Sequence, residues 1–308
     1  MPQDTSPHDP IHIALTFDDK YWAPAYTTMR SICLVSRRRE NIVFHLLHFG
    51  LSEGHRQDLE AITAEFGSKL VFYDLDNDEV LSRRIDAFPK VRARLLNKIV
   101  YVRLFLTDLL PADAKRIIYI DCDMMVRVPI EELADLDLQG HPLAAATDPY
   151  RTGFQSRRNL APKHWFDTTE YYFNAGLLVL DRDKVAEVDI VAKVLSIVTP
   201  EEFAGLYYDQ EMLNIAFRND WLMLSVMWNF QNPSQPHEAI NPHIIHYTGG
   251  NKPWLFRRKT AFKHMYRYMM TNEYYHRFMR ERIARRLPFL KPFLRLERPQ
   301  GVVIPRRH

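Results

Sequence analysis

The chain has 308 residues, 46% of them apolar and 12% aromatic, which is enough to bury one large core with or without a smaller appendage. No stretch of about 18 uncharged apolar residues is present, so the sequence predicts no transmembrane helix. Residues 1–10 are polar and lack the basic-then-apolar order of a secretory signal, so none is expected.

The net charge of +3 conceals an asymmetry along the chain. Residues 256–308 contain 15 Lys or Arg and 3 Asp or Glu, whereas residues 1–255 contain 26 and 35. The sequence therefore predicts an acidic body, residues 1–255, followed by a basic extension, residues 256–308.

Basic side chains in the extension alternate with aromatic and apolar ones, a composition typical of a segment that attaches to an anionic membrane. Nucleic acid would be attracted by the same charge, but no nucleic-acid-binding motif is present, so no nucleic-acid partner is expected. A helical appendage packed on the body is the remaining alternative.

The two cysteines, Cys33 and Cys122, lie far apart in apolar stretches. We predict that both are buried free thiols, which fits a reducing, cytoplasmic location.

Strand and helix patterns alternate from the first strand onward. Strands are predicted at residues 11–17, 42–49, 70–73, 117–123, 143–147, 172–181, 221–226 and 243–247. Helices are predicted at residues 22–39, 53–66, 91–109, 129–133, 183–198 and 208–217, an irregular segment at 74–89, and a long functional loop at 150–169. This alternation predicts an α/β fold in which a mostly parallel sheet has helices on both faces.

The pattern Asp121-Cys122-Asp123 directly follows an apolar run that predicts a strand buried on both faces. Side chains two apart on a strand point to the same side, so Asp121 and Asp123 should converge while Cys122 faces away. Converging carboxylates repel unless a cation or proton lies between them, and a divalent cation is expected at the carboxyl end of a strand. The alternative is a pair of ordinary turn or N-cap aspartates, because Asp-x-Asp is short and common.

Other polar side chains also stand where a predicted strand ends or a helix begins, and in a parallel sheet such positions gather at one edge. They are Asp18, Asp19, Asp148, Asn174, Asp209, Gln210 and His246. Each has an ordinary explanation by itself, as a turn residue, a helix cap or a histidine satisfied in the core. Their joint occurrence indicates a site.

The carboxylates of Asp121 and Asp123 and the imidazole of His246 form a mostly oxygen donor set that suits Mn²⁺ or Mg²⁺, and the nitrogen favours Mn²⁺. Structural zinc is not expected, because neither cysteine has a second ligand at zinc spacing. A cation held in this way typically bridges a diphosphate and neutralises charge on the leaving phosphate. Backbone N–H groups and an ammonium group in segment 249–252 also suit phosphate.

These motifs together resemble the retaining family-8 glycosyltransferases, and most closely the bacterial lipopolysaccharide galactosyl- and glucosyltransferases. The matching pieces stand in the order of the family and cover residues 11–255: LTFDDKY (15–21), YVRL (101–104), IIYIDCDMMV (117–126), YFNAG (172–176), YDQEMLN (208–214) and HYTGGNKPW (246–254). The resemblance implies the GT-A fold, a Rossmann-like nucleotide-sugar-binding domain in residues 1–255, with 256–308 as a basic helical extension that attaches to membrane. One departure is Lys20, where relatives often carry Asn.

The resemblance also implies a role for each matching residue, with Asp121, Asp123 and His246 holding Mn²⁺, or Mg²⁺, on the diphosphate of a UDP-sugar. The other implied contacts are Asp18, Asp19 and Tyr21 at the uridine; Arg103, Asp123, Asn174, Asp209 and Gln210 at the donor sugar; Cys122 within the Asp-x-Asp motif; Gly249 and Lys252 at the diphosphate; and Asp148 near donor sugar and acceptor. Segment 150–169 would decide the acceptor.

The implied activity moves galactose or glucose from a UDP-sugar to a lipopolysaccharide-type or other glycan acceptor, with retention, at the cytoplasmic face of the membrane. Gln210 stands where a nucleophile is needed, but an amide is a poor nucleophile, so we expect it to stabilise the cationic sugar; Asp209 is the alternative, through a covalent intermediate. Two rival functions are a non-catalytic nucleotide-sugar or glycan-binding protein and a self-glucosylating starter protein.

Overall fold

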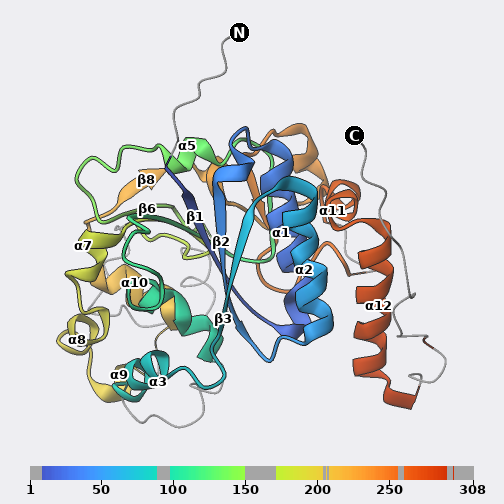
Figure 1. Cartoon of the computed structure of the whole chain (residues 1–308). Helices are drawn as coiled ribbons and strands as arrows, with labels where there is room; N and C mark the ends of the chain where they lie inside the picture. The colour runs from blue at the N-terminus through green and yellow to red at the C-terminus, as the bar shows by residue number, and fades with distance from the viewer. Residues whose placement is uncertain are drawn as a thin grey trace.

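The computed structural model describes residues 9–88, 98–149, 171–203, 206, 208–255, 260–289 and 294. Its main feature is a seven-stranded sheet with the order β3-β2-β1-β4-β7-β6-β8 (Figure 1). The strands are β1 (Ile11–Asp18), β2 (Ile42–Phe49), β3 (Lys69–Asp74), β4 (Arg116–Ile120), β6 (Leu143–Ala146), β7 (Leu177–Asp181) and β8 (Leu222–Leu224). β7 runs antiparallel to both of its neighbours, and the other pairs are parallel. The predicted mixed, mostly parallel sheet is confirmed.

Helices cover both faces of this sheet, and the sheet separates two buried apolar clusters, one on each face. One face carries α1 (Trp22–Val35), α2 (Glu53–Phe66) and α5 (Glu131–Ala134). The other carries α3 (Glu79–Asp86), α4 (Leu106–Leu109), α7 (Arg182–Ala186), α8 (Ile190–Leu195), α9 (Pro200–Phe203) and α10 (Tyr208–Ala216). The 3₁₀ helices are η1 (Asp19–Tyr21), η2 (Arg39–Asn41), η4 (Lys98–Phe105), η5 (Val226–Asn229) and η6 (Gln235–Ala239). Strands buried on both faces explain why the strand segments read as nearly continuous apolar runs.

A second, three-stranded sheet joins the late part of the chain to the Asp-x-Asp region. It consists of β5 (Met124–Val126), β10 (Ile244–His246) and β9 (Phe230–Gln231), with β10 in the middle. β10 runs antiparallel to β5, and this register sets His246 opposite Met124. The pairing of β10 with β5 places His246, the predicted ligand, close to the end of β4.

Several local predictions were wrong, including the strand predicted at 172–181, which begins only at Leu177. Residues 74–89 contain α3 rather than an irregular segment: Asp78 caps it by accepting from the amide of Leu81 (2.7 Å), and Leu81 and Ile85 bury one face. The helix predicted at 183–198 is two helices, because Asp189 caps a new start at α8. The helical pattern predicted at 91–109 is 3₁₀ from residue 98 to 105, and 91–97 lie outside the described residues.

Both cysteines are free and buried, as predicted. Cys33 Sγ lies 3.3 Å from the hydroxyl of Ser68, and burial raises the pKa of its thiol to about 12. Such a thiol stays protonated and unreactive near neutral pH.

The described part of the basic extension folds against the body. It forms α11 (Lys263–Met270) and α12 (Asn272–Arg286), which lie outside α1 at the right of Figure 1. Together with α1 and β10 they bury a third apolar cluster that includes Trp22, Tyr247, Trp254, Tyr266 and Phe278. Within the described residues, no helix is both long and apolar enough to cross a lipid bilayer.

Buried charges fasten α12 to the body around Trp22. Arg277 forms an ion pair with Asp58, and its guanidinium lies 4.4 Å from the centre of the Trp22 ring. Glu281 accepts a hydrogen bond from Trp22 Nε1 (2.9 Å) and lies 3.2 Å from Nε2 of His55. The other ring nitrogen of His55 lies 2.7 Å from Asp19 Oδ1, so one imidazole links α2, α12 and the end of β1.

This imidazole makes stability depend on pH. Burial lowers the pKa of His55, but the bonds to Asp19 and Glu281 outweigh burial and raise it to about 9. The pKas of both carboxyl groups are held below their usual range despite burial, so they stay ionised across this window. Because the folded pKa of His55 exceeds the unfolded value of about 6.5, its stabilisation is complete below pH 6.5 and is lost as the pH rises through 9.

We expect the melting temperature of the wild type to fall by roughly 3–6 °C more than that of His55→Gln between pH 6.5 and 9, after allowing for solvent screening. Scanning calorimetry across this range, with His141→Gln as a matched control at a more exposed histidine, measures the difference. Parallel curves for wild type and His55→Gln would show that the histidine does not link the helices.

Candidate active site

The Asp-x-Asp motif occupies a turn between β4 and β5. β4 ends one residue before the motif, and the amide of Met124 donates to the carbonyl of Asp121 (3.3 Å). The prediction that both carboxylates lie on one strand was therefore wrong. The turn still brings the carboxylates of Asp121 and Asp123 together, while Cys122 points away and its Sγ donates to the carbonyl of Thr16 (3.5 Å).

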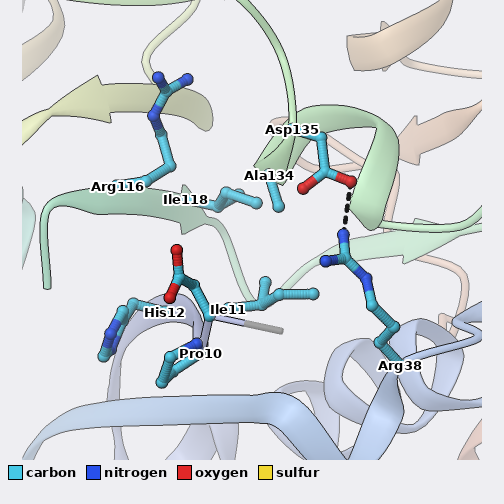
Figure 2. Close-up of a pocket in the computed structure, with 9 residues that line it drawn as sticks. Pro10, Ile11, His12, Arg38, Arg116, Ile118, Ala134 and Asp135 are labelled. Atoms are coloured by element: carbon cyan, nitrogen blue, oxygen red, sulfur yellow. Dashed lines mark hydrogen bonds and ion pairs between the residues drawn. The ribbon is translucent and has the colours of Figure 1, made fainter. Parts of the chain in front are cut away.

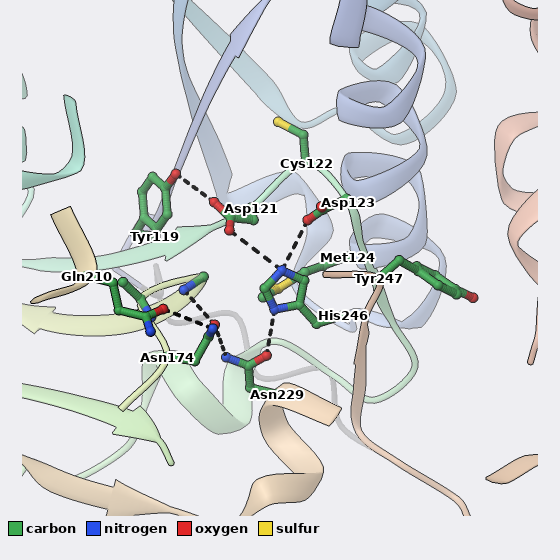
Figure 3. Close-up of polar contacts among 12 residues, drawn as sticks. Tyr119, Asp121, Cys122, Asp123, Met124, Asn174, Gln210, Asn229, His246 and Tyr247 are labelled. Atoms are coloured by element: carbon green, nitrogen blue, oxygen red, sulfur yellow. Dashed lines mark hydrogen bonds and ion pairs between the residues drawn. The ribbon is translucent and has the colours of Figure 1, made fainter. Parts of the chain in front are cut away.

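Asp121, Asp123 and His246 form the predicted cluster. One ligand atom from each lies within 4.8 Å of those of the other two. Nε2 of His246 is 3.6 Å from Asp121 Oδ2 and 3.2 Å from Asp123 Oδ1, as Figure 3 shows.

The outer oxygen of each carboxylate already has donors. Asp121 Oδ1 accepts from the hydroxyl of Tyr119 (2.9 Å) and lies 3.0 Å from Nη2 of Arg103. Asp123 Oδ2 accepts from the ammonium group of Lys252. Asp123 Oδ1, in contrast, is buried without a hydrogen bond of good geometry. A buried carboxylate oxygen that faces a second carboxylate and an imidazole fits a divalent cation, and this donor set suits Mn²⁺ or Mg²⁺.

The electrostatics keep Asp123 ionised. Burial raises the pKa of Asp123, but the charge of Lys252 and the neighbouring imidazole of His246 outweigh burial and hold this pKa well below its usual range. Burial, and then the charge of Asp123, raise the pKa of Tyr21 to about 12. The cluster thus presents an ionised carboxylate beside a neutral phenol.

Gly176 leaves the space in which the cluster fits. A Cβ atom at this position would lie 2.4 Å from Cε1 of His246, 2.8 Å from Asp121 Oδ2 and 2.9 Å from Cε of Met124. Glycine has no Cβ, so it allows side chains to approach the backbone closely at this position. Two of the side chains that approach Gly176, His246 and Asp121, belong to the cluster itself.

Asn174, Gln210 and Asp148 form a hydrogen-bonded group beside the cluster. Nε2 of Gln210 donates to Asp148 Oδ2 (3.0 Å), and Nδ2 of Asn174 donates to Gln210 Oε1 (3.0 Å) and to Asp148 Oδ2 (3.3 Å). The amide of Ala175 also donates to Gln210 Oε1 (3.2 Å). Three residues predicted at the donor sugar therefore lie in contact.

Arg103 joins this group to the Asp121–Asp123–His246 cluster. Its Nη1 donates to the carbonyl of Ala175 (2.7 Å), its Nε lies 2.9 Å from Asp209 Oδ2, and its guanidinium stacks 4.5 Å from the centre of the Tyr119 ring. Burial raises the pKa of Asp209 to about 6 although Arg103 opposes this shift. The carboxyl group of Asp209 is thus poised to titrate close to neutral pH.

The end of β1 presents Asp18 and Tyr21, whereas Asp19 turns toward α2. Asp18 caps η1 by accepting from the amide of Lys20 (3.0 Å). Asp19 accepts from the amide of Ser52 (2.9 Å) and contacts His55, so its carboxylate already has donors. Tyr21 meets the ring of Trp254 edge-on at 6.0 Å, beside segment 249–252.

Segment 249–252 follows β10 and places the ammonium group of Lys252 beside the cluster. Gly249 has a φ of +60°, a left-handed conformation that favours glycine. The ammonium group of Lys252 donates to the carbonyl of Tyr247 (2.6 Å) as well as to Asp123.

The sequence analysis missed two side chains, Tyr119 and Asn229. Tyr119 stands two residues before Asp121, and strand alternation could have identified it, because both side chains leave the backbone on the same side. Asn229 ends η5, and its Oδ1 lies 2.8 Å from Nδ1 of His246. No motif in the sequence connects Asn229 to the histidine.

A pocket of about 340 Å³ lies at the opposite edge of the sheet, between the amino ends of β1 and β4 (Figure 2). Its two arginines are already paired: Arg38 with Asp135 (2.5 Å), and Arg116 with the carbonyl of Leu136 (2.7 Å). Both arginines thus have partners, whereas at the carboxyl ends of the strands Asp123 Oδ1 is buried without one.

The sequence profile of glycosyl transferase family 8 matches residues 12–257. The chain belongs to this family. The solved structure of the galactosyltransferase LgtC with donor and acceptor sugar analogues superposes with a TM-score of 0.67 at 24% identity, covering 84% of this chain and 95% of that one. The predicted GT-A fold is confirmed by this likeness.

Two curated proteins are similar to this chain over most of its length. General stress protein A of Bacillus subtilis is 28% identical and covers 86% of this chain and 92% of its own length. Lipopolysaccharide 1,2-glucosyltransferase of Escherichia coli K12 is 24% identical and covers 79% of this chain and 72% of its own length. Two longer glycosyltransferases of Streptococcus pneumoniae are matched over only 32% and 56% of their length.

Proposed function

We propose that this glycosyltransferase moves a hexose, galactose or glucose, from a UDP-sugar to a lipopolysaccharide-type or other glycan acceptor, with retention of the anomeric configuration. The observation that carries the proposal is the cluster of Asp121, Asp123 and His246, with a buried free oxygen at its centre and Lys252 beside it. The similarity to a lipopolysaccharide glucosyltransferase supports the acceptor class.

The metal ligands in this proposal are Asp121 Oδ2, Asp123 Oδ1 and His246 Nε2. Mn²⁺, with Mg²⁺ as the alternative, would supply positive charge for the diphosphate when bound. Lys252 would donate to the departing phosphate, and Gly249 would let the backbone of its segment approach it closely. Asp18 and Tyr21 would hold the uridine.

The charges around Gln210 favour a neutral hexose over a hexuronate. Among the described residues beside Gln210, the carboxylates of Asp148 and Asp209 stand against one cation, Arg103. The guanidinium of Arg103 is already bound by Asp121, Asp209 and the carbonyl of Ala175. A sugar carboxylate would therefore meet negative charge without a free partner.

The contacts of Gln210 suit a group that orients the sugar. Its Oε1 accepts from Asn174 and Ala175, and its Nε2 donates to Asp148, so the amide is held at both ends. Asp209 remains the candidate for a covalent intermediate, but its carboxylate is paired with Arg103. We therefore assign Gln210 to stabilising the cationic sugar.

We expect Gln210→Ala to lower kcat by about 10²-fold, on the scale of losing one preorganised polar group, with a smaller change in KM. For Asp209→Asn we expect the rate to lose its decline on the acid side of about pH 6, since that decline follows protonation of Asp209. Steady-state kinetics from pH 5 to 8 measure both. Near-normal turnover in both variants would remove the pair from the mechanism.

Isothermal calorimetry of UDP with and without Mn²⁺ tests the proposed function. We expect metal-dependent binding to the wild type, about 10- to 100-fold weaker in Asp123→Ala, and unchanged binding in Asp183→Ala, a matched control at an exposed carboxylate. If UDP fails to bind the wild type in the presence of metal, the nucleotide-sugar site is disproved.

Two measurements distinguish the proposed function from the two rival functions, a non-catalytic binding protein and a self-glucosylating starter protein. Hydrolysis of the donor without acceptor would argue against a non-catalytic binding protein. A self-glucosylating starter protein would gain hexose mass on one of its own tyrosines after incubation with donor, which mass spectrometry detects.

We further propose that residues 1–255 carry catalysis and that 256–308 attach the enzyme to the cytoplasmic face of the membrane. The exposed end of α12 supports this: Ile283, Leu287 and Phe289 are 38–70% exposed beside Arg285 and Arg286. Residues 290–293 of the same apolar and basic stretch lie outside the described residues.

We expect the full chain to sediment with vesicles that contain anionic lipid and not with neutral ones, and Phe289→Ser together with Arg285→Gln to weaken this several-fold. The double variant Tyr171→Ser with Lys115→Gln serves as the control, because both side chains are exposed and distant from α12 in the sequence. Equal sedimentation with both vesicle types would remove the membrane assignment.

A further inference from the structure

Asn229 touches both halves of the site, although no motif marks it. It is 2% exposed and lies at the end of η5, next to β9. Its Oδ1 lies 2.8 Å from Nδ1 of His246, and its Nδ2 donates to Asn174 Oδ1 (2.9 Å), contacts drawn as dashed lines in Figure 3. Both ends of one amide are thus in use, one toward a metal ligand and one toward a donor-sugar residue.

The direction of these bonds follows from a backbone N–H group. The amide of Gly176 donates to Asn174 (3.0 Å), and because a backbone N–H is only a donor, the atom that receives it must be oxygen. The atom of Asn229 that faces this oxygen must then be its NH₂ group. Its carbonyl oxygen is left to face Nδ1 of His246, which must carry a proton.

A second backbone N–H group fixes the other end of the chain. The amide of Ala175 donates to Gln210 (3.2 Å), so the receiving atom is Oε1, and the NH₂ group of Gln210 must face the carboxylate of Asp148. Two neighbouring backbone amides therefore orient the whole chain His246–Asn229–Asn174–Gln210–Asp148. Each donor meets an acceptor along it.

The proton on Nδ1 leaves the lone pair of His246 on Nε2, the atom that faces Asp121 and Asp123. That tautomer is the one a metal ligand needs, and a partner on the other ring nitrogen fixes the orientation of such a ligand. We propose that Asn229 is a positioning residue: it presents Nε2 of His246 to the cation and, through Asn174, ties the metal ligands to the donor-sugar residues.

Two substitutions at Asn229 separate its contact with His246 from its contact with Asn174. Only the expected change in kcat rests on the proposed function. Asn229→Asp keeps an acceptor for His246 but loses the donor to Asn174. Asn229→Leu, of similar size, loses both. The tautomer of His246 is read from the NMR chemical shifts of its ring nitrogens in ¹⁵N-histidine-labelled protein, without metal or substrate. The spectrum of His246→Gln assigns these signals.

We expect the wild type and Asn229→Asp to show a proton on Nδ1 of His246, and Asn229→Leu to lose this preference. Mn²⁺ affinity, measured by electron paramagnetic resonance of the free ion without any sugar nucleotide, should fall about 10- to 100-fold in Asn229→Leu and stay within a few-fold in Asn229→Asp. Asn229→Asp should instead lower kcat for transfer while leaving Mn²⁺ binding intact.

A wild-type His246 protonated on Nε2 and not on Nδ1 would overturn the proposal whether or not the protein binds metal. Equal Mn²⁺ affinity in Asn229→Leu and wild type, with both folded by circular dichroism, would also overturn it. Failure of the wild type to use a UDP-sugar, with the tautomer as expected, would count against the proposed function alone.

Discussion

Gly176→Ala is expected to lower turnover by about 10³-fold or more and to abolish measurable Mn²⁺ affinity, with the protein still folded. The added Cβ would lie 2.4 Å from Cε1 of His246 and 2.8 Å from Asp121 Oδ2, closer than carbon approaches either atom. Neither side chain can withdraw easily, since Asn229 holds the imidazole and Tyr119 and Arg103 hold the carboxylate. The methyl group would force the ligands apart, and a bound cation is worth several kcal/mol to the departure of a phosphate.

Mn²⁺ titration by calorimetry and initial-rate kinetics test this expectation. Gly250→Ala is the matched control for metal binding, because a Cβ there meets nothing within 4 Å. Mn²⁺ affinity should be unchanged in that control. Retention of full Mn²⁺ affinity in Gly176→Ala would mean that the cation binds elsewhere.

Lys252→Met is expected to lower kcat without lowering the affinity for Mn²⁺. The ammonium group of Lys252 binds Asp123 Oδ2, the carboxylate whose other oxygen faces His246. In the proposed reaction this ammonium donates to the departing diphosphate, and loss of one such donor costs about 10²- to 10³-fold in kcat. Removing a positive charge from Asp123 should at the same time leave Mn²⁺ affinity equal or higher, because like charges repel.

Lys252→Arg is the matched control, since it keeps the charge on a longer and planar group. We expect it to recover part of kcat without raising Mn²⁺ affinity. Parallel losses of kcat and Mn²⁺ affinity in Lys252→Met would show instead that the lysine serves only to hold Asp123 in place.

The sequence predicted the sheet well because its strands are buried on both faces and therefore appear as apolar runs bounded by polar turns. It predicted α2 at its observed bounds, because the helix lies between two strong local capping residues, Ser52 and Gly67. It failed at α3, where only Leu81 and Ile85 bury a face of an otherwise charged helix, and where the cap at Asp78 is the sole strong local signal.

The sequence located Asp121 and Asp123 correctly, but the reason given for their convergence was wrong. Strand alternation predicted their convergence, but a turn produces it, with β4 ending before the motif and β5 beginning after it. The pattern of residues was enough to locate the carboxylates, because a short Asp-x-Asp segment can converge in either backbone form. Their partner His246 was also located, at the end of a strand, but the pairing of β10 with β5 that delivers it is long-range.

The sequence by itself determined the class of fold, the family and most of the residues at the carboxyl edge of the sheet, since these depend on local patterns and ordered motifs. Only the tertiary structure decided which atoms of those residues are free. Asp121 Oδ1 is bound by Tyr119 and Arg103, Asp19 is turned toward His55, and the imidazole of His246 is oriented by Asn229. Hydrogen bonds between residues far apart in the chain set these choices, and such bonds leave no periodic trace in the sequence.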